Sequence, residues 1–284
     1  MLVILGIAPT VALRWPSLVR LFRDEGVASC TINLLKGDIA DIAADALITS
    51  AHPYLEGPTL EQLANRWSFE GQVNADSAIR FAGGPALATA TMKLAAAAEA
   101  PLDVGSAHVT PAGELKARVV VHCIAPIAEE YSFEDGKALL EDTIMAGIRA
   151  AEEAGARSLA LPAVGCGVAG FAPEVGAKCI LDALGKWLDD SSDGVSERRL
   201  RRVDLVVFED EVMKCWRSRM LDALGEPAEI QLRSDDDFGV YRWAIRRGRR
   251  GEDEEADARA EAEQAIFGGG RFVPGFGTLS ALDD

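Results

Sequence analysis

Short apolar runs alternate with longer amphipathic stretches along most of the 284-residue chain. Apolar runs of about four to eight residues predict strands, and apolar positions that recur every three or four residues predict helices. Predicted strands cover residues 2–8, 31–35, 44–50, 106–110, 119–124, 158–163 and 203–208. Predicted helices cover residues 16–24, 77–81, 86–98, 137–154, 173–188 and 211–224. This alternation predicts an α/β fold in which helices cover both faces of a mixed, mostly parallel sheet.

The pattern changes after residue 224. Residues 229–232 predict one more strand, and the chain then becomes rich in charged residues. We interpret residues 251–284 as an appendage that is either disordered or docked through Phe267, Phe272 and Phe276. The expected organisation is therefore an N-terminal strand and helix in residues 1–30, a core domain in residues 31–224 and a C-terminal extension in residues 225–284.

The charge balance argues against a nucleic acid as the main partner. The formal net charge is −16, and the Arg-rich stretches at 198–202 and 242–250 lie close to acidic blocks. Proteins that bind a phosphate backbone gather Lys and Arg on one surface. A small anionic ligand remains compatible with this charge, because backbone N–H groups can bind phosphate without net positive charge.

The cysteines and histidines predict neither a disulfide framework nor a metal site. The five cysteines are scattered and form no C-x-x-C pair, and the three histidines are dispersed. We expect no metal, no cofactor and a location in the reducing cytoplasm. No segment is long and apolar enough to span a bilayer, so no membrane partner is expected. The apolar start of the chain lacks the basic region of a signal peptide and is interpreted as a strand.

The strongest local signal is a Gly-rich turn between a predicted buried strand and a predicted helix. Gly165, Gly167 and Gly170 crowd this turn, so several backbone N–H groups and the helix dipole can face one anion. Such a nest suits a pyrophosphate. The alternative is a tight connection between strand and helix, in which the glycines only allow the backbone to turn and bind no ligand. The turn also matches G-x-G-x-x-G, but a Rossmann site needs an acidic residue about 20 positions later at a strand end, and the next strand ends only at Phe208.

A second signal lies around Asp38, between two predicted strands. Its carboxylate can cap the turn that follows. It can equally accept hydrogen bonds from an amino group such as the exocyclic amine of adenine. The residues alone leave both roles open.

Taken together, these segments resemble the macrodomain family. The resemblance is carried, in order, by Gly37-Asp38-Ile39, Asp45-Ala46-Leu47-Ile48, residues 104–110, residues 115–126 and residues 161–171. It extends from about residue 31 to 224. It implies a three-layer α/β/α macrodomain with a central mixed, mostly parallel sheet, and a site for ADP-ribose at the carboxyl ends of the strands.

The resemblance also implies roles for individual residues. Asp38 would accept from the adenine amine, with Gly37 and the backbone of Ile39 beside it. The phosphate loop would wrap the pyrophosphate with its amides, and Phe171 would help to wall the ligand. The residues of this loop are Gly165, Cys166, Gly167, Val168, Ala169, Gly170 and Phe171. The implied partner is ADP-ribose, free or attached to a protein.

The sequence departs from the family pattern where hydrolytic members carry their catalytic residues. Thr49-Ser50-Ala51-His52 replaces Asn-Ala-Ala-Asn, and Gln72-Val73-Asn74 replaces a glycine triplet, after an insertion at about residues 53–70. Asp76 matches the acidic residue of the family's catalytic loop, whereas Ala169 stands where an aromatic residue is common. Side chains in place of the glycines should narrow the distal part of the pocket.

Three functions stay open at this point. The first is a module that binds ADP-ribose or an ADP-ribosyl group. The second is an enzyme, either a mono-ADP-ribosyl hydrolase or a phosphatase of an ADP-ribose derivative, in which Asp76 and His52 are catalytic. The third is a macrodomain fold retuned to another nucleotide.

Three smaller expectations concern the surroundings of this site. The insertion, with Trp67 and Phe69, would be a lid over the site or a hairpin packed on the outer helices. The thiol pKa of Cys166 could be lowered by the adjacent helix start, which would make it redox-sensitive, or its side chain could simply fill the loop. His108 and His122 are expected to be structural residues of their strands.

Overall fold

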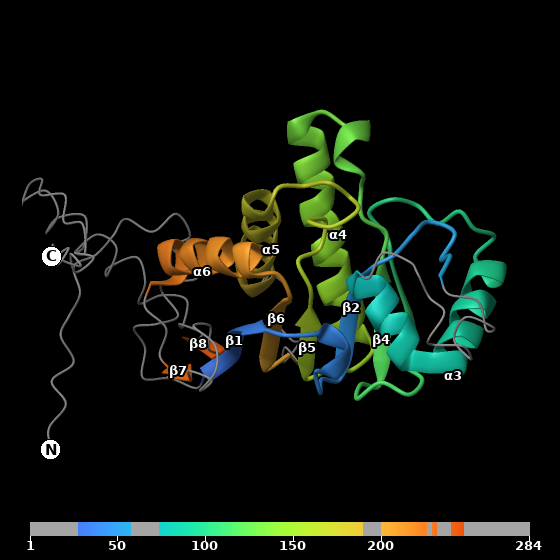
Figure 1. Ribbon diagram of the computed structural model, residues 1–284, viewed down its shortest axis with the longest axis horizontal. Coiled ribbons are helices and arrows are strands. Elements are labelled where there is room, and N and C mark those ends of the chain that lie inside the picture. The colour runs from blue at the N-terminus through green and yellow to red at the C-terminus, as the bar shows by residue number, and fades with distance from the viewer. Residues whose placement is uncertain (1–27, 58–73, 190–199, 226–228, 232–239, 247–284) are drawn as a thin grey trace, which may run out of the picture. The chain divides into compact units, whose positions relative to one another are not determined.

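The computed structural model describes residues 28–57, 74–189, 200–225, 229–231 and 240–246. Its centre is an eight-stranded sheet with the order β3-β4-β2-β5-β6-β1-β8-β7 (Figure 1). The strands are β1 (Ala28–Lys36), β2 (Ala46–Ser50), β3 (Ala107–Pro111), β4 (Val119–Cys123), β5 (Ser158–Leu161), β6 (Arg202–Val207), β7 (Glu229–Gln231) and β8 (Val240–Arg246). The helices are η1 (Ile39–Asp41), α3 (Ala75–Ala97), η3 (Ala128–Glu130), α4 (Phe133–Glu153), α5 (Pro173–Asp189) and α6 (Asp210–Leu224).

Five neighbouring strands of this sheet run parallel. β4, β2, β5, β6 and β1 pair in parallel, whereas β3, β8 and β7 pair antiparallel. Asp45 ties two of the parallel strands together at their amino ends, because its Oδ2 accepts from the backbone N–H groups of Arg157 at 2.7 Å and Ser158 at 3.1 Å. The predicted mixed, mostly parallel sheet is therefore confirmed. Parallel pairing also brings the carboxyl ends of five strands to one edge.

The two faces of the sheet bury different apolar clusters. Along β2, Ala46 and Ile48 belong to a large cluster that includes side chains of α4, α5 and α6, whereas Leu47 belongs to a smaller cluster with α3 and η1. Alternate side chains of a strand point to opposite faces, which explains this division. Figure 1 shows α3 apart from α4, α5 and α6, as the three-layer arrangement requires.

Helix α3 contains a kink that its sequence explains. It begins with a capping box between Asn74 and Ser77, and its backbone departs from helical geometry at Gly84, with φ +64°. Pro85 follows and has no N–H to donate to the preceding turn. An added Cβ at Gly84 would lie 2.6 Å from a carboxylate oxygen of Glu114. The two predicted helical segments, 77–81 and 86–98, are thus halves of one kinked element.

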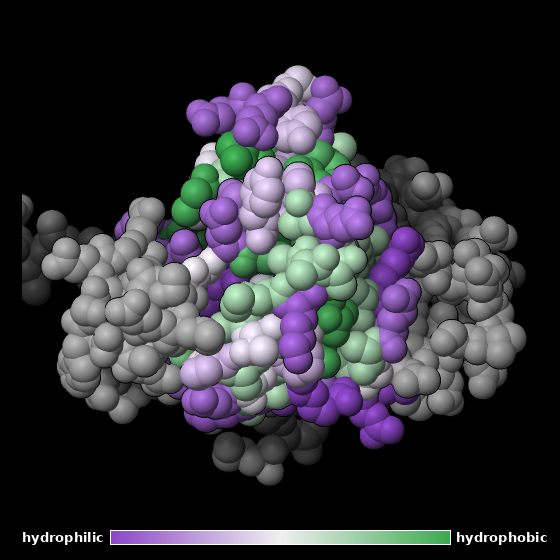
Figure 2. All heavy atoms as spheres, turned by 90° about the vertical axis from the view of Figure 1, so that its right-hand side faces the viewer, coloured by the Kyte–Doolittle hydropathy of each residue, from purple (hydrophilic) through white to green (hydrophobic). Residues whose placement is uncertain are grey.

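Figure 2 shows the side of the molecule on which α3 lies. Hydrophilic and hydrophobic residues are interspersed on this face, and the described residues visible there do not gather into one broad apolar surface. Met92, on the outer side of α3, is 63% exposed. None of the described helices is long and apolar enough to cross a membrane.

The sheet continues beyond residue 224, where the core domain was expected to end. β8 pairs antiparallel with β1, and β7 pairs with β8. The expected strand at 229–232 is confirmed as β7, but the sequence analysis assigned no strand to the Arg-bearing segment that forms β8. The described elements from β1 to β8 all belong to one compact unit.

Several expectations lie outside the described residues. They are the strand at 2–8, the helix at 16–24, the insertion from residue 58 onward with Trp67 and Phe69, and the appendage at 251–284. The division of the chain into 1–30, 31–224 and 225–284 stays a prediction, to which the structure adds the two strands beyond 224.

Candidate functional site

The predicted binding residues lie at the carboxyl edge of the parallel strands. Asp38 follows β1, the phosphate loop (residues 165–171) follows β5, and His52 follows β2. Neighbouring strands are about 4.8 Å apart. In the order β2-β5-β6-β1, the phosphate loop is therefore about 10 Å from the Asp38 turn, and the end of β2 lies one strand further on. Ligands of open α/β sheets bind along this kind of edge.

The turn after β1 keeps two hydrogen-bonding groups available. Asp38 Oδ1 accepts from the N–H of Ala40 at 2.9 Å and so caps η1. Neither Asp38 Oδ2 nor the N–H of Ile39 has a partner among the described residues. The Ile39 side chain is buried in the core on the α3 side of the sheet. The cap therefore occupies one oxygen of the carboxylate and leaves the other available.

The backbone at Gly37 is fixed from the neighbouring strand. Its N–H donates to the carbonyl of Val207 at 2.9 Å, and no atom lies within 4 Å of a Cβ built at Gly37. The turn is thus anchored to the end of β6 and open on its other side.

The phosphate loop is closed by its own hydrogen bonds. Phe171 N–H donates to Gly165 O at 2.9 Å, and Gly170 N–H donates to Gly167 O at 3.0 Å. Gly165 and Gly170 have φ of +82° and +79°, in the left-handed region that glycine adopts without steric cost. The backbone conformation of the turn therefore favours glycine at both positions.

Four amides of this loop remain without an acceptor among the described residues. They are the N–H groups of Gly165, Gly167, Val168 and Ala169. Val168 is 72% exposed, and no atom lies within 4 Å of a Cβ built at Gly167. Helix α5 begins just after the loop and adds the partial positive charge of its N-terminus. The arrangement can bind an anion through backbone groups alone.

Two side chains of the phosphate loop point into the protein. Phe171 is 6% exposed, and its ring lies against Gly136 of α4. The sulfur of Cys166 lies against the backbone of Gly176 in α5. Both side chains pack on the protein side of the loop. A ligand on the open side could therefore contact Cys166 only at its backbone.

The expectation of a lowered thiol pKa at Cys166 is wrong. Burial raises its pKa to about 12, and the nearby sulfurs of Cys179 and Cys215 act in the same direction. Desolvation disfavours the thiolate. The side chain is packed away from the open face of the loop, which is why the helix start does not stabilise its charge. The alternative interpretation, a small residue that fills the loop, agrees with this packing.

Asp76 lies in the first turn of α3 with both carboxylate oxygens engaged. Oδ1 accepts from Thr49 Oγ1 at 2.8 Å, and Oδ2 accepts from Arg80 Nε at 2.6 Å. Arg80 is 6% exposed, and its Nη1 donates to the carbonyl of Leu55 at 3.1 Å. Asp76 is thus part of a network that joins α3, β2 and the loop after β2.

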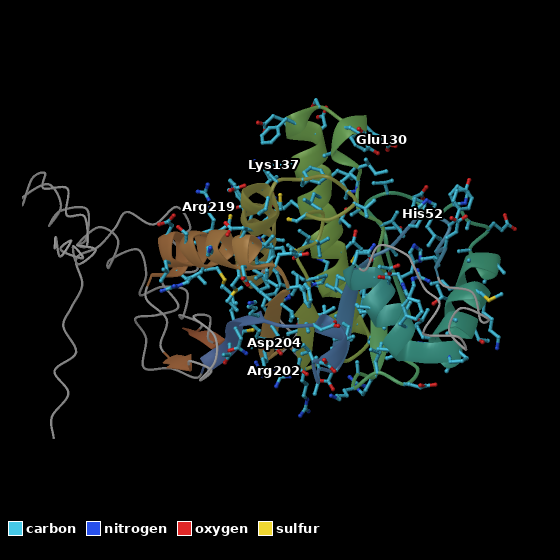
Figure 3. The ribbon with its side chains drawn as sticks, viewed as in Figure 1. His52, Glu130, Lys137, Arg202, Asp204 and Arg219 are labelled. Atoms are coloured by element: carbon cyan, nitrogen blue, oxygen red, sulfur yellow. The ribbon has the colours of Figure 1, made fainter. Side chains whose placement is uncertain are left out.

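His52 lies in that same loop, with an exposed side chain (Figure 3). Its Nδ1 accepts from the N–H of Tyr54 at 3.3 Å and is 3.9 Å from Glu56 Oε2. The rings of His52 and Tyr54 are stacked, with centroids 5.7 Å apart. Among the described residues no hydrogen bond or ion pair joins His52 to Asp76, so the predicted catalytic pair is not coupled directly.

His122 is fully buried on β4 and shares a 2.9 Å hydrogen bond between its Nε2 and Thr110 Oγ1. Burial, together with the charges of Arg80 and His108, lowers its pKa to about 3. His122 is therefore neutral, and its predicted structural role is confirmed. The described residues contain no group of three or more His, Cys, Asp or Glu side chains that could hold a metal.

The sequence analysis missed two residues of this edge. Phe208 follows β6 directly, is 67% exposed, and lies next to Val207, the partner of Gly37. The sequence pattern placed Phe208 at the end of a predicted strand, without a role in the site. Arg80 follows Asp76 at i+4, a spacing that predicts an ion pair on a helix, but the sequence does not show that the pair is buried.

Comparisons with known proteins agree on one family. The Macro domain model matches residues 64–180. A macro domain-containing protein of Vibrio parahaemolyticus is 34% identical over 147 residues, which are 52% of this chain and 77% of the relative. A protein of Escherichia fergusonii named O-acetyl-ADP-ribose deacetylase is 31% identical over 157 residues, 54% of this chain and 80% of the relative.

The fold gives the same result. A solved structure described as the Oceanobacillus iheyensis macrodomain with ADP superposes with a TM-score of 0.57 at 19% identity, over 69% of this chain and 93% of that one. The resemblance drawn from the sequence motifs is confirmed. The chain belongs to the macrodomain family.

Proposed function

We propose that this protein binds ADP-ribose, or an ADP-ribosyl group carried by a protein, along the carboxyl edge of its sheet. One observation carries the proposal. Among the described residues, the turn after β1 keeps an acceptor without a partner, Asp38 Oδ2, beside a donor without a partner, the N–H of Ile39. The phosphate loop, two strands away, keeps four amides that have no acceptor in that part of the chain. A nucleoside diphosphate has matching groups, since one end is a base and the other a pyrophosphate.

The turn after β1 suits an adenine. The exocyclic amine of adenine donates hydrogen bonds, and the adjacent ring nitrogen accepts them. Asp38 Oδ2 would accept from the amine, and the N–H of Ile39 would donate to the ring nitrogen. Phe208, exposed at the next strand end, offers an aromatic face on which the base can stack. Stacking of a base on an aromatic ring contributes about 1–3 kcal/mol.

The phosphate loop suits the pyrophosphate. Its free amides are backbone groups, so their positions depend on the turn geometry at Gly165 and Gly170 rather than on mobile side chains. This mode of binding explains how a chain with a net charge of −16 can hold a dianionic ligand. The names of the relatives support the ligand class, because ADP and O-acetyl-ADP-ribose share the adenosine diphosphate portion.

Hydrolysis of an ADP-ribose derivative is the second candidate, favoured by the deacetylase name of one group of relatives. The geometry favours binding instead. Asp76 is held by Thr49 and Arg80, and among the described residues no hydrogen bond or ion pair joins it to His52. For the hydrolase or phosphatase, Asp76 and His52 would have to carry the chemistry. Equal turnover of O-acetyl-ADP-ribose or ADP-ribose 1″-phosphate by the wild type and by His52→Ala would exclude His52 from it.

Calorimetric titration with ADP-ribose tests the binding function. The informative variant is Asp38→Asn, because an amide keeps the shape of the carboxylate but supplies only one acceptor. Whichever way the amide turns, either the cap of η1 or the contact with the adenine amine is lost. We expect micromolar affinity for the wild type and a loss of about ten-fold or more in Asp38→Asn, equivalent to about 1.4 kcal/mol.

Asp41→Asn is the matched control. Asp41 lies in the same turn with its side chain 81% exposed, so its replacement should leave the affinity unchanged. Equal losses in both variants would show that the carboxylate of Asp38 has no specific role. Absence of binding by the wild type would remove ADP-ribose as the ligand and leave another nucleotide as the remaining candidate.

A further inference from the structure

Arg80 connects the start of α3 to the loop that follows β2. Its Nε donates to Asp76 at 2.6 Å, and its Nη1 donates to the carbonyl of Leu55 at 3.1 Å. A Cβ built at Gly57 would lie 2.6 Å from Arg80 Cδ, so the backbone of the loop packs directly on this side chain. One buried guanidinium therefore joins the loop to the carboxylate of Asp76.

The loop that Arg80 holds has an unfavourable backbone conformation. Leu55 has φ +54°, in the left-handed region that residues other than glycine rarely adopt. Its N–H donates to the carbonyl of His52 at 2.7 Å, while its own carbonyl accepts from Arg80. Such a conformation persists where surrounding contacts enforce it. The contact from Arg80 is one of these.

The guanidinium also has an unused donor in the buried space beside the loop. Arg80 Nη2 is buried and has no hydrogen-bond partner among the described residues, and the same is true of Nδ1 of the fully buried His122 on β4. Thr49, the partner of Asp76, pairs with His122 across the two strands. The network thus reaches the sheet at the end of β2 and keeps polar groups there that the described protein residues do not satisfy.

The position of this network fixes which part of a ligand it can influence. In the strand order β2-β5-β6-β1, the adenine turn follows β1 and the phosphate loop follows β5. The end of β2 is the next position along the same edge. On the proposed function, the group beyond the pyrophosphate, which in ADP-ribose is the second ribose, lies at the end of β2 and against the loop that Arg80 holds.

We propose that Arg80 is a positioning residue for the part of the site that takes the sugar beyond the pyrophosphate. It acts through the loop 51–57 and through Asp76, and it makes no contact with the adenosine diphosphate portion. This inference rests on the proposed function and assigns different parts of the ligand to different parts of the site. The Asp38 turn and the phosphate loop bind ADP, and the network of Arg80 determines whether the second ribose is accommodated.

Parallel titrations with ADP and with ADP-ribose test this inference. We expect Arg80→Gln to lower the affinity for ADP-ribose about ten-fold relative to wild type while the affinity for ADP changes less than about two-fold. Arg80→Lys keeps a cation near Asp76 but cannot donate to both Asp76 and Leu55 in the same planar geometry. It should recover only part of the loss. Lys93→Gln, an exposed change on the same helix, is the control and should alter neither affinity.

The two ligands separate the possible outcomes. If Arg80 has a purely structural role, its replacement should lower the affinities for ADP and for ADP-ribose by the same factor. That result would overturn the inference. Equal affinities of the wild type for the two ligands would overturn it as well, because the second ribose would then make no contact that Arg80 could control. Failure of the wild type to bind either ligand would instead contradict the proposed function. If Arg80→Gln does not fold, the ratio of the two affinities in Arg80→Lys decides.

Discussion

Arg80 Nε lies 2.6 Å from Oδ2 of Asp76, one helical turn earlier in α3, and the pair is largely buried. The carboxylate that the family pattern places in the catalytic loop is therefore held by a cation of its own helix and by Thr49. An engaged carboxylate of this kind stabilises the local structure, and it is less free to orient a water molecule.

The first prediction concerns the stability of this pair. Asp76→Ala should lower the free energy of unfolding by about 3–5 kcal/mol, because it leaves the buried guanidinium of Arg80 without its partner. Urea denaturation measures the change. The double variant Asp76→Ala, Arg80→Met should recover part of the loss, since the unpaired charge is then removed. A loss below about 1 kcal/mol in Asp76→Ala would mean that the pair behaves like an exposed one.

A second prediction concerns pH. His122 has a pKa of about 3 in the folded protein, against 6.5 in the unfolded chain. Between these values the unfolded chain binds a proton that the folded protein does not, so the free energy of unfolding falls as the pH falls from about 6.5 toward about 3. The expected slope from this residue is about 1.4 kcal/mol per pH unit.

His122→Gln should remove this contribution. Urea denaturation between pH 7 and pH 5 measures it as the difference between the slopes of wild type and variant, which cancels the titration of other groups. Parallel slopes for wild type and His122→Gln would show that His122 binds its proton equally well in the folded and unfolded states, which would contradict this prediction.

The third prediction separates two glycines of the phosphate loop. Gly165→Ala should destabilise the protein by about 1–3 kcal/mol, because φ is +82° and the added methyl group would lie 2.9 Å from Leu140. Gly167→Ala should change stability by less than about 0.5 kcal/mol, since nothing lies within 4 Å of the added atom. Thermal and urea denaturation measure both effects.

Gly167→Ala should nevertheless weaken the binding of ADP-ribose. The methyl group would project into the open space of the loop, where the pyrophosphate is proposed to lie. An affinity loss of about ten-fold with unchanged stability is expected from calorimetry. Unchanged affinity would indicate that the ligand does not approach this side of the loop.

A fourth prediction concerns the thiols. Burial raises the pKa of Cys30, Cys123 and Cys166 to about 12 and that of Cys179 to about 11. Because the thiolate is the reactive form, these cysteines should react with a disulfide reagent at pH 8 far more slowly than a free thiol. Unfolding in guanidinium should expose them to rapid labelling. Fast modification of Cys166 in the native protein would contradict its packing on α5.

The sequence predicted the elements of the sheet well, because their apolar runs are bounded by Gly, Pro and polar residues. The turn at Asp38 and the phosphate loop were predictable for a similar reason, since each follows directly on such a run. Strand β8 was missed. Its Arg-rich sequence is typical of a solvent-exposed segment, and only its pairing with β1 shows that it belongs to the sheet.

The role of Asp76 depended on contacts between segments distant in the sequence. The contact of Arg80 with Leu55 crosses 25 positions, and no local pattern indicates that it forms. The direction of the Cys166 side chain depends likewise on its packing against Gly176 in α5. Local sequence placed both residues near the site but could not show which groups they face.

The most direct test of the central claim is a titration of the ¹⁵N-labelled protein with ADP-ribose, followed through its assigned amide signals. Binding at the proposed site should give saturable shifts in the amide signal of Ile39 and in those of the four loop amides that have no acceptor among the described residues, Gly165, Gly167, Val168 and Ala169. Amides at the opposite edge of the sheet, such as those of Arg157 and Ser158, should stay unchanged. Shifts confined to other parts of the chain, or no shifts at millimolar ligand, would contradict the proposed site.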